Sequence, residues 1–230
     1  MEQAFTTLLR TCLQACRISH DQDALDAFRN TFWGAAHRMI AKHVVVEDGS
    51  RFPLDVGSGK HAQLARALTA AGGAIGQKVI VTSIDNNEEH VSDNADRFTN
   101  ILLVHHDVHD PLGFQNGLFD GLTSSFCMEY VQRKRIRTVL QQLGRVLKNG
   151  SPVAFAVYAL SFEDDDLVEL LDTGSEDWNH MPGRVLKEHM LACGYRDVRV
   201  ESSQCHEIEE QFPGFSEMTL FSVVTGVYQP

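Results

Sequence analysis

The chain has 230 residues, of which 43% are hydrophobic and 22% charged, values that suit one globular domain with a sizeable core. Its net charge of -11 argues against nucleic acid or an anionic membrane surface as a partner, and no apolar run is long enough to cross a bilayer. The five cysteines form no C-x-x-C pair, so we expect a reduced, cytoplasmic protein.

The first part of the chain has the spacing of helices. Apolar residues recur at intervals of three and four through residues 4–36, which predicts helical structure over residues 1–43. We expect residues 1–45 to form a helical cap in front of a ligand-binding domain over residues 46–230.

From residue 51 onward, short apolar runs alternate with helical patterns. Strands are predicted at 52–56, 78–85, 100–107, 117–126 and 152–160, and helices at 61–71, 87–98, 128–148 and 182–195. Two further strands, 196–202 and 217–227, have no helix between them and should pair antiparallel. This order predicts an α/β fold: a doubly wound, mostly parallel seven-stranded sheet with an antiparallel terminal strand, preceded by N-terminal helices. Ligands of such sheets bind just beyond the carboxyl ends of the strands.

A glycine-rich turn follows the first predicted strand, in "RFPLDVGSGKHAQLARAL" (51–68). A phosphate loop needs G-x-x-x-x-G-K-[ST], and Leu54 and His61 occupy two of its fixed positions, which excludes it. The segment 57–62 does fit the dinucleotide pattern G-x-G-x-x-[GA]. However, the carboxylate of Asp55 would repel a pyrophosphate on the helix N-terminus and attract a cation. The turn therefore favours a ligand with adenosine and a positive charge, a description that S-adenosylmethionine (SAM) meets.

Three acids, Asp55, Asp85 and Asp107, end three consecutive predicted strands. Each stands where a ligand made of adenosine and a cation offers a hydrogen-bond donor or a positive charge. Such acids can also cap the N-termini of the following helices. Capping explains one or two of them well and all three together less well.

Five segments in this order and spacing resemble the class I SAM-dependent methyltransferases over roughly residues 50–228. "LDVGSGKH" is similar to the first motif of that family, "LFDGLTSSFCMEYV" to the fourth, and "CGYRDVRV" to the start of the sixth strand. The resemblance implies that Asp85 contacts the ribose and Asp107 the adenine. The whole cofactor site that it implies consists of Asp55, Gly57, Ser58, Gly59, Asp85, Asn86, Asp107, Val108, Ser124, Ser125 and Phe126.

Two residues after the fourth predicted strand, Glu129 and Tyr130, are the candidate catalytic residues. They lie near the point where the methyl group and its acceptor should meet, so either could deprotonate or orient an acceptor. Both could equally cap or line the start of the following helix.

The candidate substrate-binding residues come from three other segments. Trp33 and His37 lie in the leading helices, where plain helix packing is the alternative. Tyr158 ends the fifth predicted strand. Trp178 and His180 lie in the acidic stretch 161–180, which could be a lid or a solvated loop.

The segment "HHDVHD" (105–110) resembles a metal site, because His105, Asp107 and His109 share one face of an extended chain. The same segment coincides with the third methyltransferase motif, in which Asp107 already has a role. We therefore predict no metal.

These observations predict a methyltransferase that passes a methyl group from SAM to a small-molecule acceptor by in-line displacement. We expect no nucleic-acid or membrane partner, and a homodimer is compatible with the sequence. Three alternatives stay open: an NAD(P)-dependent oxidoreductase, a non-catalytic relative that acts through protein contacts, and a relative that transfers or rearranges another part of SAM. The terminal strand pair and Asp55 count against the oxidoreductase.

Overall fold

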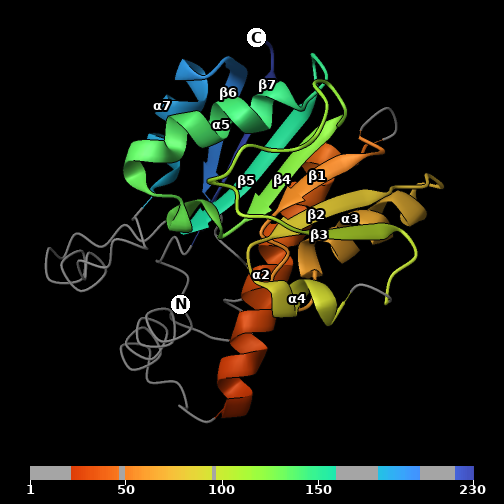
Figure 1. Cartoon of the computed structure of the whole chain (residues 1–230). Coiled ribbons are helices and arrows are strands. Elements are labelled where there is room, and N and C mark those ends of the chain that lie inside the picture. The colour runs from red at the N-terminus through yellow and green to blue at the C-terminus, as the bar shows by residue number, and fades with distance from the viewer. Residues whose placement is uncertain (1–21, 47–49, 95–96, 159–180, 203–220) are drawn as a thin grey trace, which may run out of the picture.

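The structure, a computed structural model, describes residues 22–46, 50–94, 97–158, 181–202 and 221–230. Its centre is a seven-stranded sheet in the order β3-β2-β1-β4-β5-β7-β6 (Figure 1). The strands are β1 (Pro53–Val56), β2 (Val81–Asp85), β3 (Ile101–His105), β4 (Gly121–Ser125), β5 (Pro152–Tyr158), β6 (Tyr195–Ser202) and β7 (Phe221–Tyr228). The first five pair in parallel, and β7 lies antiparallel between β5 and β6. The predicted fold class and terminal antiparallel pairing are confirmed.

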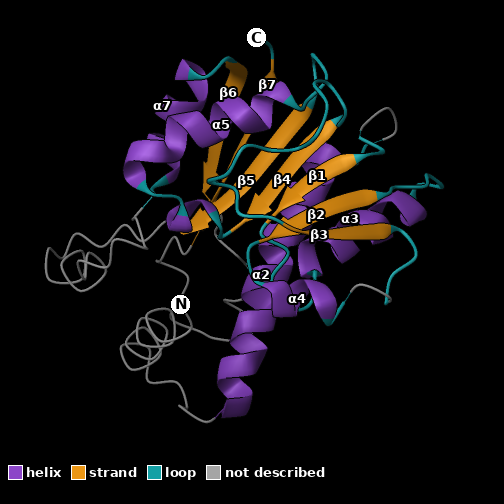
Figure 2. Ribbon diagram, in the orientation of Figure 1, coloured by secondary structure: helices purple, strands orange, loops and turns teal. Residues whose placement is uncertain are grey.

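Helices cover both faces of the sheet (Figure 2). One face carries α2 (Gln22–Val44) and α3 (Gln63–Ala74), and the other carries α5 (Ile136–Arg145) and α7 (Gly183–Ala192). The short α4 (Glu88–Ser92) follows β2. None of these described helices combines the length and the hydropathy that a membrane span requires.

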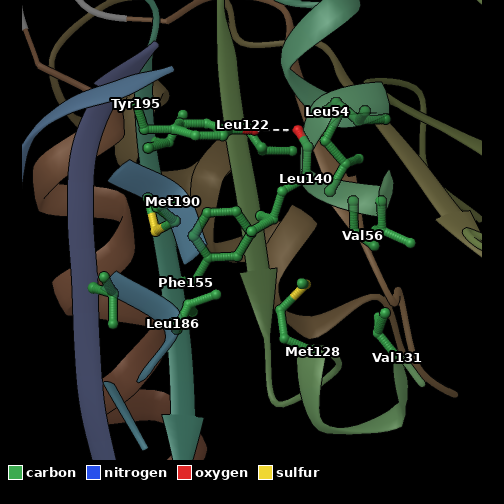
Figure 3. Packing of buried hydrophobic residues seen from close by; sticks show 14 of the residues in the cluster. Leu54, Val56, Leu122, Met128, Val131, Leu140, Phe155, Leu186, Met190 and Tyr195 are labelled. Atoms are coloured by element: carbon green, nitrogen blue, oxygen red, sulfur yellow. Dashed lines mark hydrogen bonds between the residues drawn. The ribbon is translucent and has the colours of Figure 1, made fainter. Parts of the chain in front are cut away.

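The core on the α5/α7 face joins the middle of the sheet to its terminal strands (Figure 3). Phe155 of β5 and Leu122 of β4 are fully buried there beside Met190 of α7. The hydroxyl of Tyr195, at the start of β6, donates to the carbonyl oxygen of Leu140 in α5 at 2.8 Å. This packing holds β4 and β5 rigidly below the edge at which a ligand would bind.

The helix predicted over 128–148 is wrong in its first third. Two 3-10 turns, η1 (Met128–Tyr130) and η2 (Arg133–Arg135), precede α5, and Gln132 between them has an extended ψ of 129°. A contact from a distant segment explains the break: the Gln132 N–H donates to Nε2 of His109 at 3.2 Å, and the Arg135 guanidinium donates to the His109 carbonyl.

Two other helix ends differ from the prediction. The helix expected to stop at Gly72 and Gly73 continues to Ala74. Gly72 is a packing position, since a Cβ added there would collide with Val79. The helix predicted over 87–98 is limited to the five residues of α4.

The proposed N-terminal cap is represented by α2 alone, since residues 1–21 lie outside the described part. Phe32, Ala36 and Ile40 of α2 are buried against the sheet and α3. Trp178 and His180 also lie outside the described residues.

Candidate functional site

The glycine loop turns over the end of β2. The N–H groups of Gly57 and Ser58 both donate to the Ile84 carbonyl, at 2.8 and 3.2 Å. Gly57 has a φ of 84°, and a Cβ added there would lie 2.7 Å from the Cβ and 2.8 Å from the Sγ of Cys127. Gly59 also has a positive φ, of 61°, but nothing lies within 4 Å of its added Cβ. The loop is therefore closed by Cys127 on one side and open above Gly59.

Asp85 holds this loop and the start of α4 together. Its Oδ2 accepts from the Gly59 N–H at 2.8 Å and from the Ser58 hydroxyl at 3.3 Å. Its Oδ1 accepts from the Asn87 N–H at 2.9 Å and lies 3.3 Å from Nδ1 of His90. The carboxylate thus sits beside the loop, as expected from the sequence, and its contact with a ribose stays a prediction.

Asn94 is a site residue that the sequence did not reveal. Its buried side-chain amide donates to the Lys60 and His90 carbonyls, each at 2.7 Å. Asn94 thereby ties the end of the glycine loop to α4. No motif marks this residue, because its partners lie in two different elements.

Asp55 lies between strands rather than in the loop. It is 0% exposed, and its carboxylate accepts from the hydroxyls of Ser83 on β2 at 2.7 Å and Thr123 on β4 at 3.2 Å. Burial raises the pKa of Asp55 to about 7, against the lowering effect of these two hydrogen bonds. The sequence suggested a carboxylate that faces the loop; strand alternation turns it instead onto the α2/α3 face, where both adjacent strands carry hydroxyls.

Asp107 lies two residues beyond the end of β3, and its side chain is 45% exposed. Its Oδ1 accepts from the backbone N–H of His109 at 2.9 Å and from Nδ1 of the same ring at 2.8 Å. Partial burial opposes its charge, but the hydrogen bonds from His109 and the nearby Arg135 outweigh burial and lower the pKa of Asp107. Oδ2 has no hydrogen-bond partner among the described residues, so it is available to a ligand such as an adenine amino group. Val108 is half-buried beside it.

The histidines of this segment point to other partners than a shared ion. Nδ1 of His109 is occupied by Asp107, and its Nε2 accepts from Gln132. Nε2 of His105 lies 3.1 Å from the carbonyl of Asn86, a residue whose own side chain is exposed. Over the described ranges, no three His, Cys, Asp or Glu side chains are grouped so that they could hold a metal ion.

The end of β4 is linked to both β1 and α2. The Ser124 hydroxyl donates to the Val56 carbonyl at 2.9 Å, and the Ser125 hydroxyl lies 3.1 Å from Nε2 of His37. Burial, with a smaller effect of Arg38, lowers the pKa of His37 to about 4. His37 is therefore neutral at physiological pH and serves as a fixed hydrogen-bonding partner at this edge.

Aromatic rings close the edge beyond β4 and β5. Phe126 has a positive φ of 53°, and its ring stacks on Tyr158 with a centroid distance of 4.5 Å. Phe32 of α2 stacks on Phe126 at 5.1 Å, and Phe221 meets Phe32 edge-on at 5.2 Å. Trp33 is half-buried against the same cluster. Phe126 and Tyr158, predicted to contact cofactor and substrate, thus belong to one stack.

Glu129 is fully buried in η1. Its Oε1 accepts from the Tyr158 N–H at 2.8 Å, while Oε2 is buried without a hydrogen-bond partner in the described residues. Burial raises the pKa of Glu129 to about 7. Glu129 therefore joins the turn after β4 to the end of β5, and Tyr130 beside it is half-buried. Their catalytic roles stay predictions.

The comparison with known families finds a match in the central part of the chain. Residues 54–150, which contain most of β1, the strands β2 to β4, the glycine loop and the three acids, match the family model of the methyltransferase domain. The order of the seven strands is that of the class I methyltransferase fold. No curated protein matches the chain in sequence.

Solved structures resemble the chain over most of its length. A chain of the complex between the Haloferax volcanii Trm112 methyltransferase activator and a methyltransferase has 17% identity and a TM-score of 0.65, covering 90% of this chain and 95% of its own. A SAM-dependent methyltransferase from Mesorhizobium loti has 14% identity and a TM-score of 0.64, covering 86% and 97%. Haemonchus contortus phosphoethanolamine N-methyltransferase 2, in complex with SAM, has 14% identity and a TM-score of 0.63, covering 86% of this chain and 53% of its own. At these identities the likeness concerns the fold.

SAM is the cofactor of class I methyltransferases, and the carboxyl edge fits it in three respects. The space above Gly59 is open to a ligand that approaches the backbone. The free Oδ2 of Asp107 is an acceptor, and the Asp85 carboxylate lies beside the same loop. The carboxyl edge of the sheet therefore presents a preformed cradle of two carboxylates and a glycine turn.

Proposed function

We propose that the chain transfers a methyl group from SAM to a small-molecule acceptor. The observation that supports the proposal is the open face above Gly59, with Asp85 at the end of β2 and Asp107 just beyond the end of the neighbouring β3. The net charge of -11 disfavours nucleic acid as the acceptor. The likeness to a phosphoethanolamine N-methyltransferase supports a small acceptor, whereas the likeness to a chain from an activator complex makes a protein partner the alternative.

The residues of this chain would act mainly by alignment and by exclusion of water. SAM supplies a methyl group on a sulfonium, which is already a good leaving group. The Asp85-bound loop and Asp107 would fix the adenosine, and the end of β4 would face the reacting end. Orientation of the two reactants in a dry site can supply most of the rate enhancement.

The acceptor side consists of His37 with Ser125 and of the stack formed by Phe126 and Tyr158. Neutral His37 would share a hydrogen bond with Ser125 and orient a polar group of the acceptor. The rings would supply a dry wall beside it. Glu129 is too deeply buried to touch an acceptor directly, so we infer that it positions the end of β5 through the Tyr158 N–H.

Calorimetric titration tests the cofactor assignment. The purified chain is titrated with SAM, S-adenosylhomocysteine and NADH, and the titrations are repeated with Asp107→Asn and with Asp110→Asn, an exposed control three residues away. We expect the two adenosyl ligands to bind, and Asp107→Asn to weaken them about tenfold because a charged hydrogen-bond acceptor is lost. The control should bind like the wild type.

The other outcomes separate the alternatives. Binding of NADH alone would overturn the proposal in favour of an oxidoreductase. Binding of SAM without methyl transfer to any member of a panel of small amines, phenols and carboxylic acids would favour the non-catalytic relative. Conversion of SAM into products other than S-adenosylhomocysteine would favour transfer of another part of SAM.

A further inference from the structure

A cavity lies on the α2/α3 face of the sheet. Its volume is about 700 Å³, and its walls come from α2, from α3 and from the segment 97–101 that leads into β3. Asp85 and Asp107 do not line it. Its size is within the range of sites that hold small molecules.

The charge of this cavity is opposite to that of the chain. Three arginines line it, one from each wall: Arg38, Arg66 and Arg97. No acidic residue is among the described residues of the lining, although the chain carries a net charge of -11. Neither Arg66 nor Arg97 has a carboxylate partner within the described ranges. Arg66 and Arg97 repel one another, and an anion bound between them would remove that repulsion.

One of these arginines is also held in place. The guanidinium of Arg66 lies over the ring of Phe98 at 5.6 Å, a cation–π contact that restricts its motion. Neutral side chains that can donate hydrogen bonds, Asn30, Gln63 and Asn100, lie in the same lining. Guanidinium groups bind carboxylates and phosphates through two parallel hydrogen bonds, and neutral amides can complete the coordination.

We propose that this cavity binds a small molecule that carries two or more phosphate or carboxylate groups. Charges from three walls favour a ligand with several anionic groups over a single monovalent ion. Asp85 and Asp107 do not line the cavity, so its ligand differs from SAM. His37, which we place on the acceptor side, does line it, so the ligand would lie next to the methyl acceptor.

The test uses pyrophosphate and citrate as probes on the full chain, by calorimetry and by thermal unfolding, without SAM. We expect submillimolar binding of at least one probe. Arg66→Gln and Arg97→Gln should each weaken it about tenfold, which is about 1.4 kcal/mol, because a charge-assisted hydrogen bond is lost. Arg133→Gln, which removes an exposed arginine in η2, is the matched control and should change nothing. Tighter binding of pyrophosphate or of citrate identifies phosphate or carboxylate as the recognised group.

Two results would overturn the proposal: no binding of either probe at millimolar concentration, or equal weakening by Arg133→Gln, which would mark the effect as general surface charge. Arg66→Lys keeps the charge and guards against misfolding, so it should retain part of the binding. SAM binding, measured on the same variants, should be unchanged. If the wild type does not bind SAM, the proposed function is contradicted, but the proposal for this cavity is unaffected.

Discussion

Gly57 and Gly59 share one loop and a positive φ, yet only Gly57 touches a neighbouring side chain. We expect Gly57→Ala to lower the free energy of unfolding by about 2–4 kcal/mol, because a left-handed backbone and a clash with Cys127 add. Gly59→Ala should cost about 1 kcal/mol of stability but weaken SAM binding, since its Cβ enters the open face. Urea unfolding and calorimetry measure the two effects. Equal unfolding costs for both variants would contradict the role of the Cys127 contact.

Glu129 allows a positioning role to be separated from proton transfer. Glu129→Gln keeps an oxygen that can accept from the Tyr158 N–H and removes the titration near pH 7. We expect kcat to fall less than about tenfold in this variant and about a hundredfold in Glu129→Ala, which breaks the link to β5. A pH profile decides: if Glu129→Gln abolishes a pH dependence of kcat near pH 7 together with most of the activity, Glu129 is a general base and the positioning role is wrong.

Single site residues were predictable in position but not in contacts. The acids at 85 and 107 could be found because each follows a recognisable strand. The partners of Asp55 could not, because Ser83 and Thr123 are ordinary hydroxyl residues 28 and 68 positions away. Only the pairing of β1 with both neighbours brings them together. The contacts of Asn94 could not be predicted for the same reason, because its partners lie in different elements.

The helix α2 offers a test at the scale of an element. Phe32 is 2% exposed and packs on Phe126, Tyr158 and Phe221. Phe32→Ala should lower the free energy of unfolding by about 3–5 kcal/mol, the usual cost of removing a buried ring. Leu191→Ala, at an exposed position of α7, should cost less than about 1 kcal/mol. Chemical denaturation of both variants measures the difference, and similar costs would mean that α2 is only loosely held on the sheet.

Elements were predictable where local pattern and tertiary structure agree. Every strand of the sheet was found, because buried β-branched runs bounded by turn residues have few other solutions. The segment 128–135 was mispredicted because its apolar spacing continues that of α5. Its backbone bends to satisfy His109, more than twenty residues earlier, and no local pattern reports such a contact.

Buried titratable groups give the whole molecule an unusual pH dependence. The pKa values of Asp55 and Glu129 are raised to about 7, so both bind more protons folded than unfolded between about pH 4 and 7, and their contribution to stability falls as the pH rises through that window. His37, whose pKa is lowered to about 4, acts oppositely: its contribution is lost as the pH falls from 6.5 to 4. In the wild type these slopes partly cancel.

Variants should uncover the separate slopes. Asp55→Asn removes a contribution to stability that falls as the pH rises. The free energy of unfolding of this variant, relative to that of the wild type, should therefore rise by up to about 1.4 kcal/mol per pH unit between pH 4 and 7. His37→Gln should show the reverse trend between pH 4 and 6.5. Unfolding free energies from urea titrations at several pH values provide the measurement. Parallel curves for wild type and Asp55→Asn would show that this carboxyl has a similar pKa folded and unfolded.

The strand order also has a consequence for folding during synthesis. β7 is the last of the seven strands to leave the ribosome, yet it pairs with every residue of β5 on one side and holds β6 on the other. Until residue 228 has emerged, the backbone N–H and C=O groups along the outer edge of β5 are unpaired, and β6 has no strand with which to pair. The nascent domain should therefore pass through an aggregation-prone, five-stranded stage that chaperones have reason to shield.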